Sequence, residues 1–242
     1  MRGDFETPMT RNFSNLSTLP QSLRRSLREW RTGRSSAAYS MAALQPLIGD
    51  TYLPWNHYSV TPDLARQVCN EVVINRRHEI LEFGSGVMTV ILVALARNLD
   101  LPLRIRSIDQ DRGWLQVVER MAGDPGPATL DLVHAPLIAY RGETSAPAPV
   151  RWYDMSEVEI ADRSIDLAIV DGPDDVGWSR WAALPYLQPR LAERCAFVLD
   201  DVHFSGVRRI AGDWRKRLGG EFKVERQPLV EWYRRGECWE VD

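Results

Sequence analysis

Acidic side chains follow four apolar segments of the sequence, each short enough to be a buried strand. These acids are Glu82, Asp109, Asp171 and the adjacent pair Asp200 and Asp201. Carboxylates can accept hydrogen bonds from sugar hydroxyls, hold a hard cation or act as general bases. Because parallel strands of a doubly wound sheet present their carboxyl ends at one edge, we expect these side chains to meet around one ligand.

A glycine-containing turn follows the first of these segments. Gly84 and Gly86 lack a Cβ atom, so the backbone there can approach a ligand closely. The helix expected after the turn offers free N–H groups at its start. Asp109 comes about twenty residues later, where a carboxylate usually binds both ribose hydroxyls. The pattern predicts a nucleotide or nucleoside ligand.

The residues around this turn favour one kind of nucleoside over another. A dinucleotide-binding turn needs a third glycine where Thr89 stands. A carboxylate at Glu82 would repel a pyrophosphate but suits a ligand that carries an ammonium and a sulfonium. An NAD-dependent oxidoreductase remains an alternative function. Thr89 and Glu82 argue against it.

Alternating apolar segments and helical periodicity place these residues on a regular framework. We expect helices to begin at Thr61-Pro62 and to cover 87–98, 113–121, 178–194 and 205–218, and we expect a loop over 135–150. Strands are expected at 79–83, 103–109, 129–134, 165–170, 195–199, 222–226 and 237–241. The sequence thus predicts an α/β fold with a doubly wound, mostly parallel sheet of about seven strands. A helical and aromatic extension over 1–62 would precede a ligand-binding domain over 63–242.

Composition narrows the function classes. The 242 residues carry a net charge of −3 and only three cysteines, without zinc-ligand spacing. No apolar run reaches the ~20 residues of a membrane span, and a basic nucleic-acid-binding domain is not indicated. We expect a cytoplasmic protein that binds a small molecule. The arginines between 24 and 34 predict an amphipathic helix that packs on its own domain or on a second subunit; a membrane-surface helix or a transit peptide is the alternative.

Three segments together resemble motifs of class I S-adenosylmethionine (SAM)-dependent methyltransferases. They are Ile80–Thr89 (ILEFGSGVMT), Ser107–Trp114 (SIDQDRGW) and Ile165–Pro173 (IDLAIVDGP). Three more resemble a bacterial small-molecule O-methyltransferase branch: Tyr52–Tyr58 (YLPWNHY), Leu132–Leu137 (LVHAPL) and Val198–Asp201 (VLDD). The sequence departs from many members at Met88, where they have a third glycine.

The resemblance implies a contact for each part of SAM. Glu82, Gly84, Ser85 and Gly86 would line its methionine portion, with Asp171 beside them, and Asp109 would bind its ribose. The adenine would lie against two short segments, with the candidate contacts Gln110, Asp111, Trp114, His134 and Ala135.

The resemblance also implies a catalytic end. Catechol-type and macrolide-sugar O-methyltransferases hold Mg²⁺ with a similar aspartate followed by an Asp-Asp or Asp-Asn pair, so Asp171, Asp200 and Asp201 are candidate metal ligands. A metal-free site, in which Asp200 merely caps a helix, is equally open. The general base would be Asp171 itself or a nearby histidine, His203 or His57.

The function expected from these residues is SAM-dependent O-methylation of a small hydroxylated metabolite, with or without Mg²⁺. The alternatives are an N-methyltransferase of a small amine, the oxidoreductase above, and a non-catalytic SAM-binding module. A homodimer formed through the N-terminal extension is a further expectation. Four aromatic residues could wall the acceptor pocket: Trp55, Tyr58, Tyr153 and Trp178.

Overall fold

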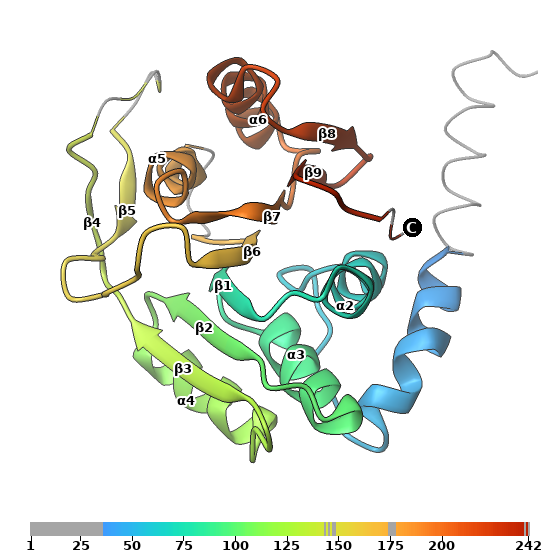
Figure 1. The fold of residues 1–242 in the computed structure, drawn as a ribbon. Coiled ribbons are helices and arrows are strands. Elements are labelled where there is room, and N and C mark those ends of the chain that lie inside the picture. The colour runs from blue at the N-terminus through green and yellow to red at the C-terminus, as the bar shows by residue number, and fades with distance from the viewer. Residues whose placement is uncertain are drawn as a thin grey trace, which may run out of the picture.

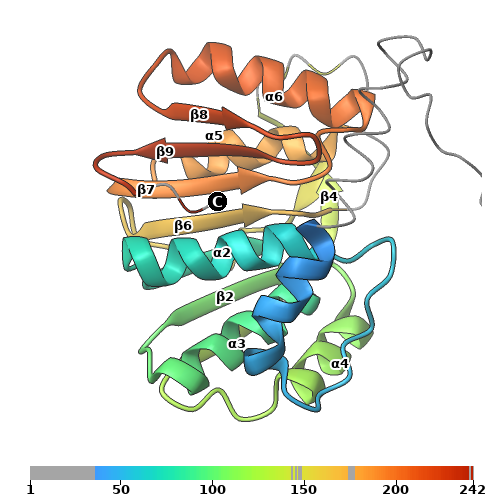
Figure 2. The ribbon, with the colours of Figure 1, turned by 90° about the vertical axis from the view of Figure 1, so that its right-hand side faces the viewer.

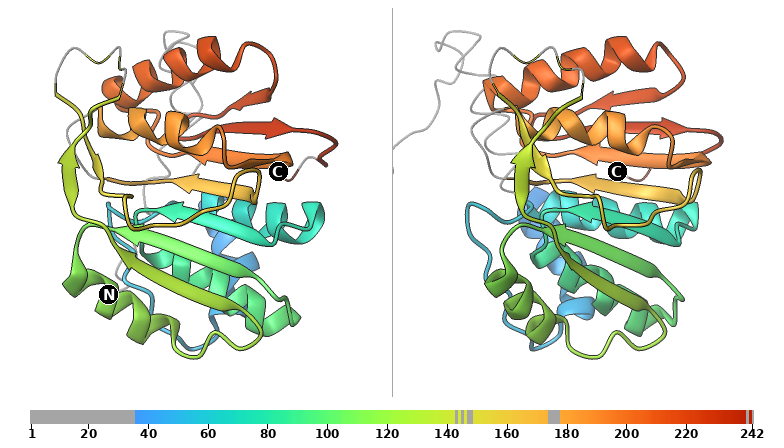
Figure 3. Two further views of the ribbon diagram at one scale, coloured as in Figure 1. Left: turned by 60° about the vertical axis from the view of Figure 1, so that its left-hand side comes forward. Right: turned by 90° about the vertical axis from the view of Figure 1, so that its left-hand side faces the viewer.

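A seven-stranded, mostly parallel sheet forms the centre of the molecule (Figure 1). The computed structural model describes residues 36–142, 144, 146, 149–173, 178–239 and 241. Strand order is β3-β2-β1-β6-β7-β9-β8, in which β9 runs antiparallel to both of its neighbours. A separate ribbon of two antiparallel strands, β4 and β5, stands near the edge where the parallel strands end (Figure 3). The predicted α/β fold class is confirmed.

The elements of this fold have the following bounds. The strands are β1 Glu79–Phe83, β2 Arg104–Asp109, β3 Thr129–His134, β4 Leu137–Ala139, β5 Arg151–Tyr153, β6 Ile165–Val170, β7 Leu191–Leu199, β8 Lys223–Arg226 and β9 Glu231–Arg235. The helices are α2 Pro62–Asn75, α3 Val87–Leu99, α4 Arg112–Ala122, the 3₁₀ turn η2 Ser179–Ala182, α5 Ala183–Leu187 and α6 Ser205–Leu218. Residues 36–48 form a further helical segment.

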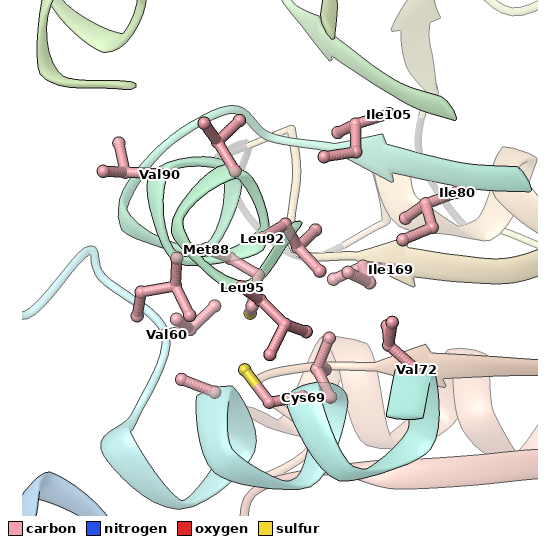
Figure 4. Packing of buried hydrophobic residues seen from close by; sticks show 14 of the residues in the cluster. Val60, Cys69, Val72, Ile80, Met88, Val90, Leu92, Leu95, Ile105 and Ile169 are labelled. Atoms are coloured by element: carbon pink, nitrogen blue, oxygen red, sulfur yellow. The ribbon is translucent and has the colours of Figure 1, made fainter. Parts of the chain in front are cut away.

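Successive side chains of each strand point to opposite faces of the sheet. Both faces therefore carry apolar side chains, and helices cover both. On one face, Ile80 and Ile169 pack with α2 and α3 in the cluster drawn in Figure 4. Leu81 and Val170 point the other way, into a second cluster with α5 and α6, and Figures 2 and 3 show the two helical layers. When helices cover both faces of a parallel sheet, ligands bind outside the carboxyl ends of its strands.

Residues before α2 also contribute to this core. Leu44, Leu53 and Val60 are buried in the first cluster, and the hydroxyl of Ser40 donates to the Asp63 carboxylate at 2.6 Å. The domain boundary expected at residue 62 stays a prediction. The arginine-rich helix expected over 24–34 lies outside the described residues. Within the described ranges, no helix is long and apolar enough to cross a membrane.

Local signals explain most element boundaries. Thr61 Oγ1 accepts from the Leu64 amide at 3.2 Å, so the predicted N-cap of α2 is confirmed. Gly219, at φ 58°, ends α6 as expected.

Three expected boundaries were wrong. The helix expected over 178–194 is reduced to η2 and α5, and β7 begins at Leu191 because the chain turns at Pro189. The last strand is β9, whereas residues 236–239 and 241 are not in a strand. The loop expected over 135–150 contains β4.

Candidate cofactor and acceptor site

The turn after β1 brings the ends of β1, β2 and β6 together. Gly84 has φ 93° and its amide donates to the Ile108 carbonyl at 2.9 Å. A Cβ atom placed on Gly84 would lie 2.9 Å from the amide nitrogen of Gly172, just after β6. Gly86, in contrast, has extended backbone, and a Cβ there would meet nothing within 4 Å. Gly84 therefore allows the ends of β1 and β6 to pack closely. Gly86 leaves free space at the start of α3.

Glu82 is the buried acid beneath this turn. One of its carboxylate oxygens accepts from the Thr89 hydroxyl at 2.5 Å and from the Ser107 hydroxyl at 2.6 Å. Burial raises the pKa of Glu82 to about 7, and the negative charge of Asp109 acts in the same direction. The two hydroxyl donors oppose this rise, so Glu82 exchanges its proton near neutral pH.

This pKa of about 7 gives the free energy of unfolding a pH dependence. An unfolded chain releases the Glu82 proton near its ordinary pKa of 4.5. The stability that protonation supplies is therefore full below about pH 4.5 and is lost as the pH rises through about 7. Over this pH range, we expect the free energy of unfolding to fall about 3 kcal/mol less in Glu82→Gln than in the wild type. Urea denaturation between pH 4.5 and 8 measures it, with Glu79→Gln, on the same strand, as control. Equal slopes in the wild type and Glu82→Gln would contradict the assignment.

Asp109, at the end of β2, connects the turn to α4. Its two carboxylate oxygens accept from the backbone amides of Ser85 at 3.1 Å and Asp111 at 2.8 Å. Each oxygen keeps a further lone pair for a ligand hydroxyl. Trp114 donates its indole N–H to the Ser85 carbonyl at 2.7 Å. These hydrogen bonds hold the Asp109 carboxylate at the position where the sequence predicts a ribose.

The predicted adenine contacts separate into two groups. Gln110, Asp111 and Trp114 line a cavity of about 540 Å³ that runs over the strand ends. His134 and Ala135 do not line this cavity: the His134 ring lies 3.2 Å from the Gln110 carbonyl, and Ala135 is buried. The remaining cofactor candidates also line the cavity: Glu82, Gly84, Ser85, Gly86, Asp109 and Asp171.

Two buried polar atoms at this cavity have no hydrogen-bond partner among the described residues. They are Oε1 of Gln110 and the hydroxyl of Tyr153. Tyr153 is 2% exposed, and burial raises the pKa of its phenol, which therefore remains a neutral donor. Buried polar groups without partners cost free energy that a bound ligand can recover.

Asp171, Asp200 and Asp201 converge, as predicted, but a guanidinium group lies among them. Arg180 Nη2 donates to the Asp171 backbone carbonyl and, at 2.9 Å, to Asp201 Oδ2. Burial and the charge of Asp200 raise the pKa of Asp171 well above its ordinary value. Burial and the charge of Asp201 raise that of Asp200 to about 7. Among the described residues, no group of three or more His, Cys, Asp or Glu side chains is arranged to hold a metal ion.

A second cavity of about 570 Å³ adjoins the first. Trp55 and Val60, from the segment before α2, line one part of this second cavity. Asp200 and His203, which follow β7, line it as well. Six residues line both cavities: Asn56, His57, Ser59, Val60, Asp201 and His203. Of the four aromatic residues expected at an acceptor pocket, Trp55 lines the second cavity, Tyr58 and Tyr153 line the first, and Trp178 lines neither.

Comparison of structures, rather than of sequences, identifies proteins similar to this chain. No family model matches the sequence, and no curated protein matches it either. The SAH-bound methyltransferase PaMTH1 of Podospora anserina is similar with a TM-score of 0.57 and 14% identity, over 86% of this chain and 96% of that one. A methyltransferase from Geobacter sulfurreducens gives 0.51 at 16% identity, over 81% and 88%. This chain has the Rossmann-like fold of class I methyltransferases.

Proposed function

We propose that the chain is a SAM-dependent methyltransferase that methylates a hydroxyl group of a small molecule. The observation that carries this proposal is the pair of adjoining cavities over the strand ends. The first suits SAM: it combines a buried carboxylate, an aspartate with free lone pairs for ribose hydroxyls, and two polar atoms that have no partner in the described part of the chain. The second suits an acceptor that meets the methyl group where the cavities join. PaMTH1, with a similar fold, is described as SAH-bound.

Each part of the first cavity matches one part of SAM. The carboxylate of Glu82 suits the methionine ammonium, and Asp109 suits the ribose hydroxyls. Gln110 beside Asp111 offers an acceptor for the adenine amino group. When bound, SAM supplies an electrophilic methyl group on its sulfonium. The residues of the chain align it with the acceptor, and alignment of two reactants can contribute about 7–11 kcal/mol to the barrier reduction.

Tyr153→Phe is expected to weaken SAM binding about threefold to tenfold, because the ligand then loses the hydrogen bond that the buried Tyr153 hydroxyl would give it. Tyr186→Phe is the matched control, since its hydroxyl is also buried without a partner among the described residues but does not line the cavity. Isothermal titration calorimetry with SAM measures both variants. Equal affinities in Tyr153→Phe and the wild type would remove Tyr153 from the site.

The acceptor cavity holds the candidate base. His203 lines both cavities, its side chain is 42% exposed, and its Nδ1 lies 3.9 Å from Asp201 Oδ1. A neutral imidazole can take the proton of an acceptor hydroxyl as the oxygen attacks the methyl carbon. The bond from sulfur to methyl breaks as the new bond to oxygen forms, and SAH leaves. Asp171, the other catalytic candidate, is already contacted by Arg180.

The predicted Mg²⁺ does not fit the residues as they are arranged. Arg180 Nη2 donates to Asp201 Oδ2 and lies 3.5 Å from Asp171 Oδ1, so a guanidinium already occupies the side of the cluster that these two carboxylate oxygens face. No step of the proposed reaction therefore passes through a metal. Dimerisation through residues 1–62 and a cytoplasmic location remain predictions, for which light scattering and fractionation are the tests.

A screen for SAH release tests the proposal. Purified protein with SAM is offered matched pairs of small molecules that differ only in a hydroxyl or an amine, each with and without EDTA. We expect turnover with hydroxyl acceptors that survives EDTA. Turnover with the amines alone would instead establish an N-methyltransferase, and SAM binding without turnover on any acceptor would favour a binding module.

A further inference from the structure

The acid cluster at the ends of β6 and β7 contains its own cation. Arg180 belongs to η2, and its side chain is only 9% exposed. Its Nη1 donates to the Asp200 carbonyl at 3.1 Å, and its Nη2 donates to the Asp171 carbonyl and to Asp201 Oδ2. Nη2 also lies 3.5 Å from Asp171 Oδ1. One guanidinium therefore contacts the backbone or the carboxylate of all three aspartates.

A guanidinium and a divalent ion cannot share this position. A hard cation binds carboxylate oxygens at about 2.0–2.6 Å, whereas Arg180 Nη2 is 2.9 Å from Asp201 Oδ2 and 3.5 Å from Asp171 Oδ1. Both would also be positive charges at contact distance in a buried setting. Metal binding would require Arg180 to leave a position where four oxygens of the three aspartates lie within hydrogen-bond range of its two terminal nitrogens.

We propose that Arg180 is the resident cation of this site and takes the place that three converging carboxylates would otherwise give to a divalent metal. It is a positioning residue: it holds Asp171 and Asp201 at the cavity where SAM and acceptor would meet. It also offsets their charge. The role in methyl transfer rests on the function proposed above, whereas the competition between Arg180 and a metal can be measured without turnover.

Electron paramagnetic resonance of Mn²⁺ measures this competition directly, because bound Mn²⁺ loses its sharp free-ion signal. The wild type is expected to bind no Mn²⁺ at this site at pH 8. Arg180→Ala removes the guanidinium from the three aspartates and is expected to gain about one Mn²⁺ per chain. Arg180→Lys keeps a positive charge and is expected to gain none. Arg190→Ala, whose guanidinium stacks on Tyr186 away from the cluster, is the control.

A thermal melt in Mg²⁺ gives a second readout. Carboxylates that lose their cation repel one another, so Arg180→Ala is expected to melt lower than the wild type and to recover in Mg²⁺, whereas Arg190→Ala does not recover. Stoichiometric Mn²⁺ binding by the wild type would overturn the proposal, and this holds even if Arg180→Ala fails to fold. A folded Arg180→Ala that gains no Mn²⁺ would overturn it too. If SAM does not bind to the wild type but the Mn²⁺ results are as expected, the proposed function fails and the resident cation stands.

Discussion

Gly84→Ala is expected to lower the free energy of unfolding by about 2–5 kcal/mol, the sum of a left-handed backbone at a non-glycine residue and an overpacked contact. The backbone at Gly84 has φ 93°, and the new methyl group would lie 2.9 Å from the Gly172 amide nitrogen. The contact is equally close from the other side, because a Cβ atom placed on Gly172 would lie 2.8 Å from Gly84 Cα. The ends of β1 and β6 must separate, and SAM binding is expected to fall below detection.

Gly86→Ala is the matched control for this result. Its backbone is extended, and its added methyl group would meet no atom of the described non-neighbouring residues within 4 Å. The variant should keep wild-type stability in urea denaturation but bind SAM more weakly, because the methyl group projects into space that the ligand needs. If both glycine variants lose the same stability, the distinction between a packing glycine and a cavity glycine is wrong.

His203→Ala is expected to lower kcat about 10²- to 10⁴-fold, the usual contribution of a general base, while the Kd for SAM stays unchanged. The reason is its position where the cofactor and acceptor cavities join. Stopped-assay kinetics, with calorimetric titration of SAM beside them, are the measurement.

Two other histidines make this test specific. His78 is exposed before β1 and lines neither cavity, so His78→Ala should keep full activity. His57 lines both cavities and is the rival base. A large loss in His57→Ala with an active His203→Ala would transfer the assignment to His57.

The positions of the strand-end acids were predictable because parallel strands impose them. The segments that became β1, β3 and β6 have the expected bounds. Glu82, Asp109 and Asp171 then meet at one edge by topology alone. Turn chemistry, such as the Thr61 N-cap, is equally local and therefore readable.

What the sequence could not reveal depends on contacts between distant segments. Arg180 is one of 28 arginines in a chain with two lysines, so its type carried no signal. It was also expected inside a long helix, whereas η2 is a 3₁₀ turn that directs it at Asp201. The exclusion of His134 and Ala135 from the cavity likewise depends on how β3 packs beside β2.

The central claim is that a nucleoside sulfonium ligand binds at the β1 turn. Calorimetric titration of the purified chain with SAM, with SAH and with NAD tests this directly, beside Asp109→Asn and the surface control Asp131→Asn. We expect one site for SAM and SAH, no heat from NAD, and affinity about tenfold or more weaker in Asp109→Asn alone. An absence of heat from both SAM and SAH, or saturable binding of NAD in their place, would contradict the account.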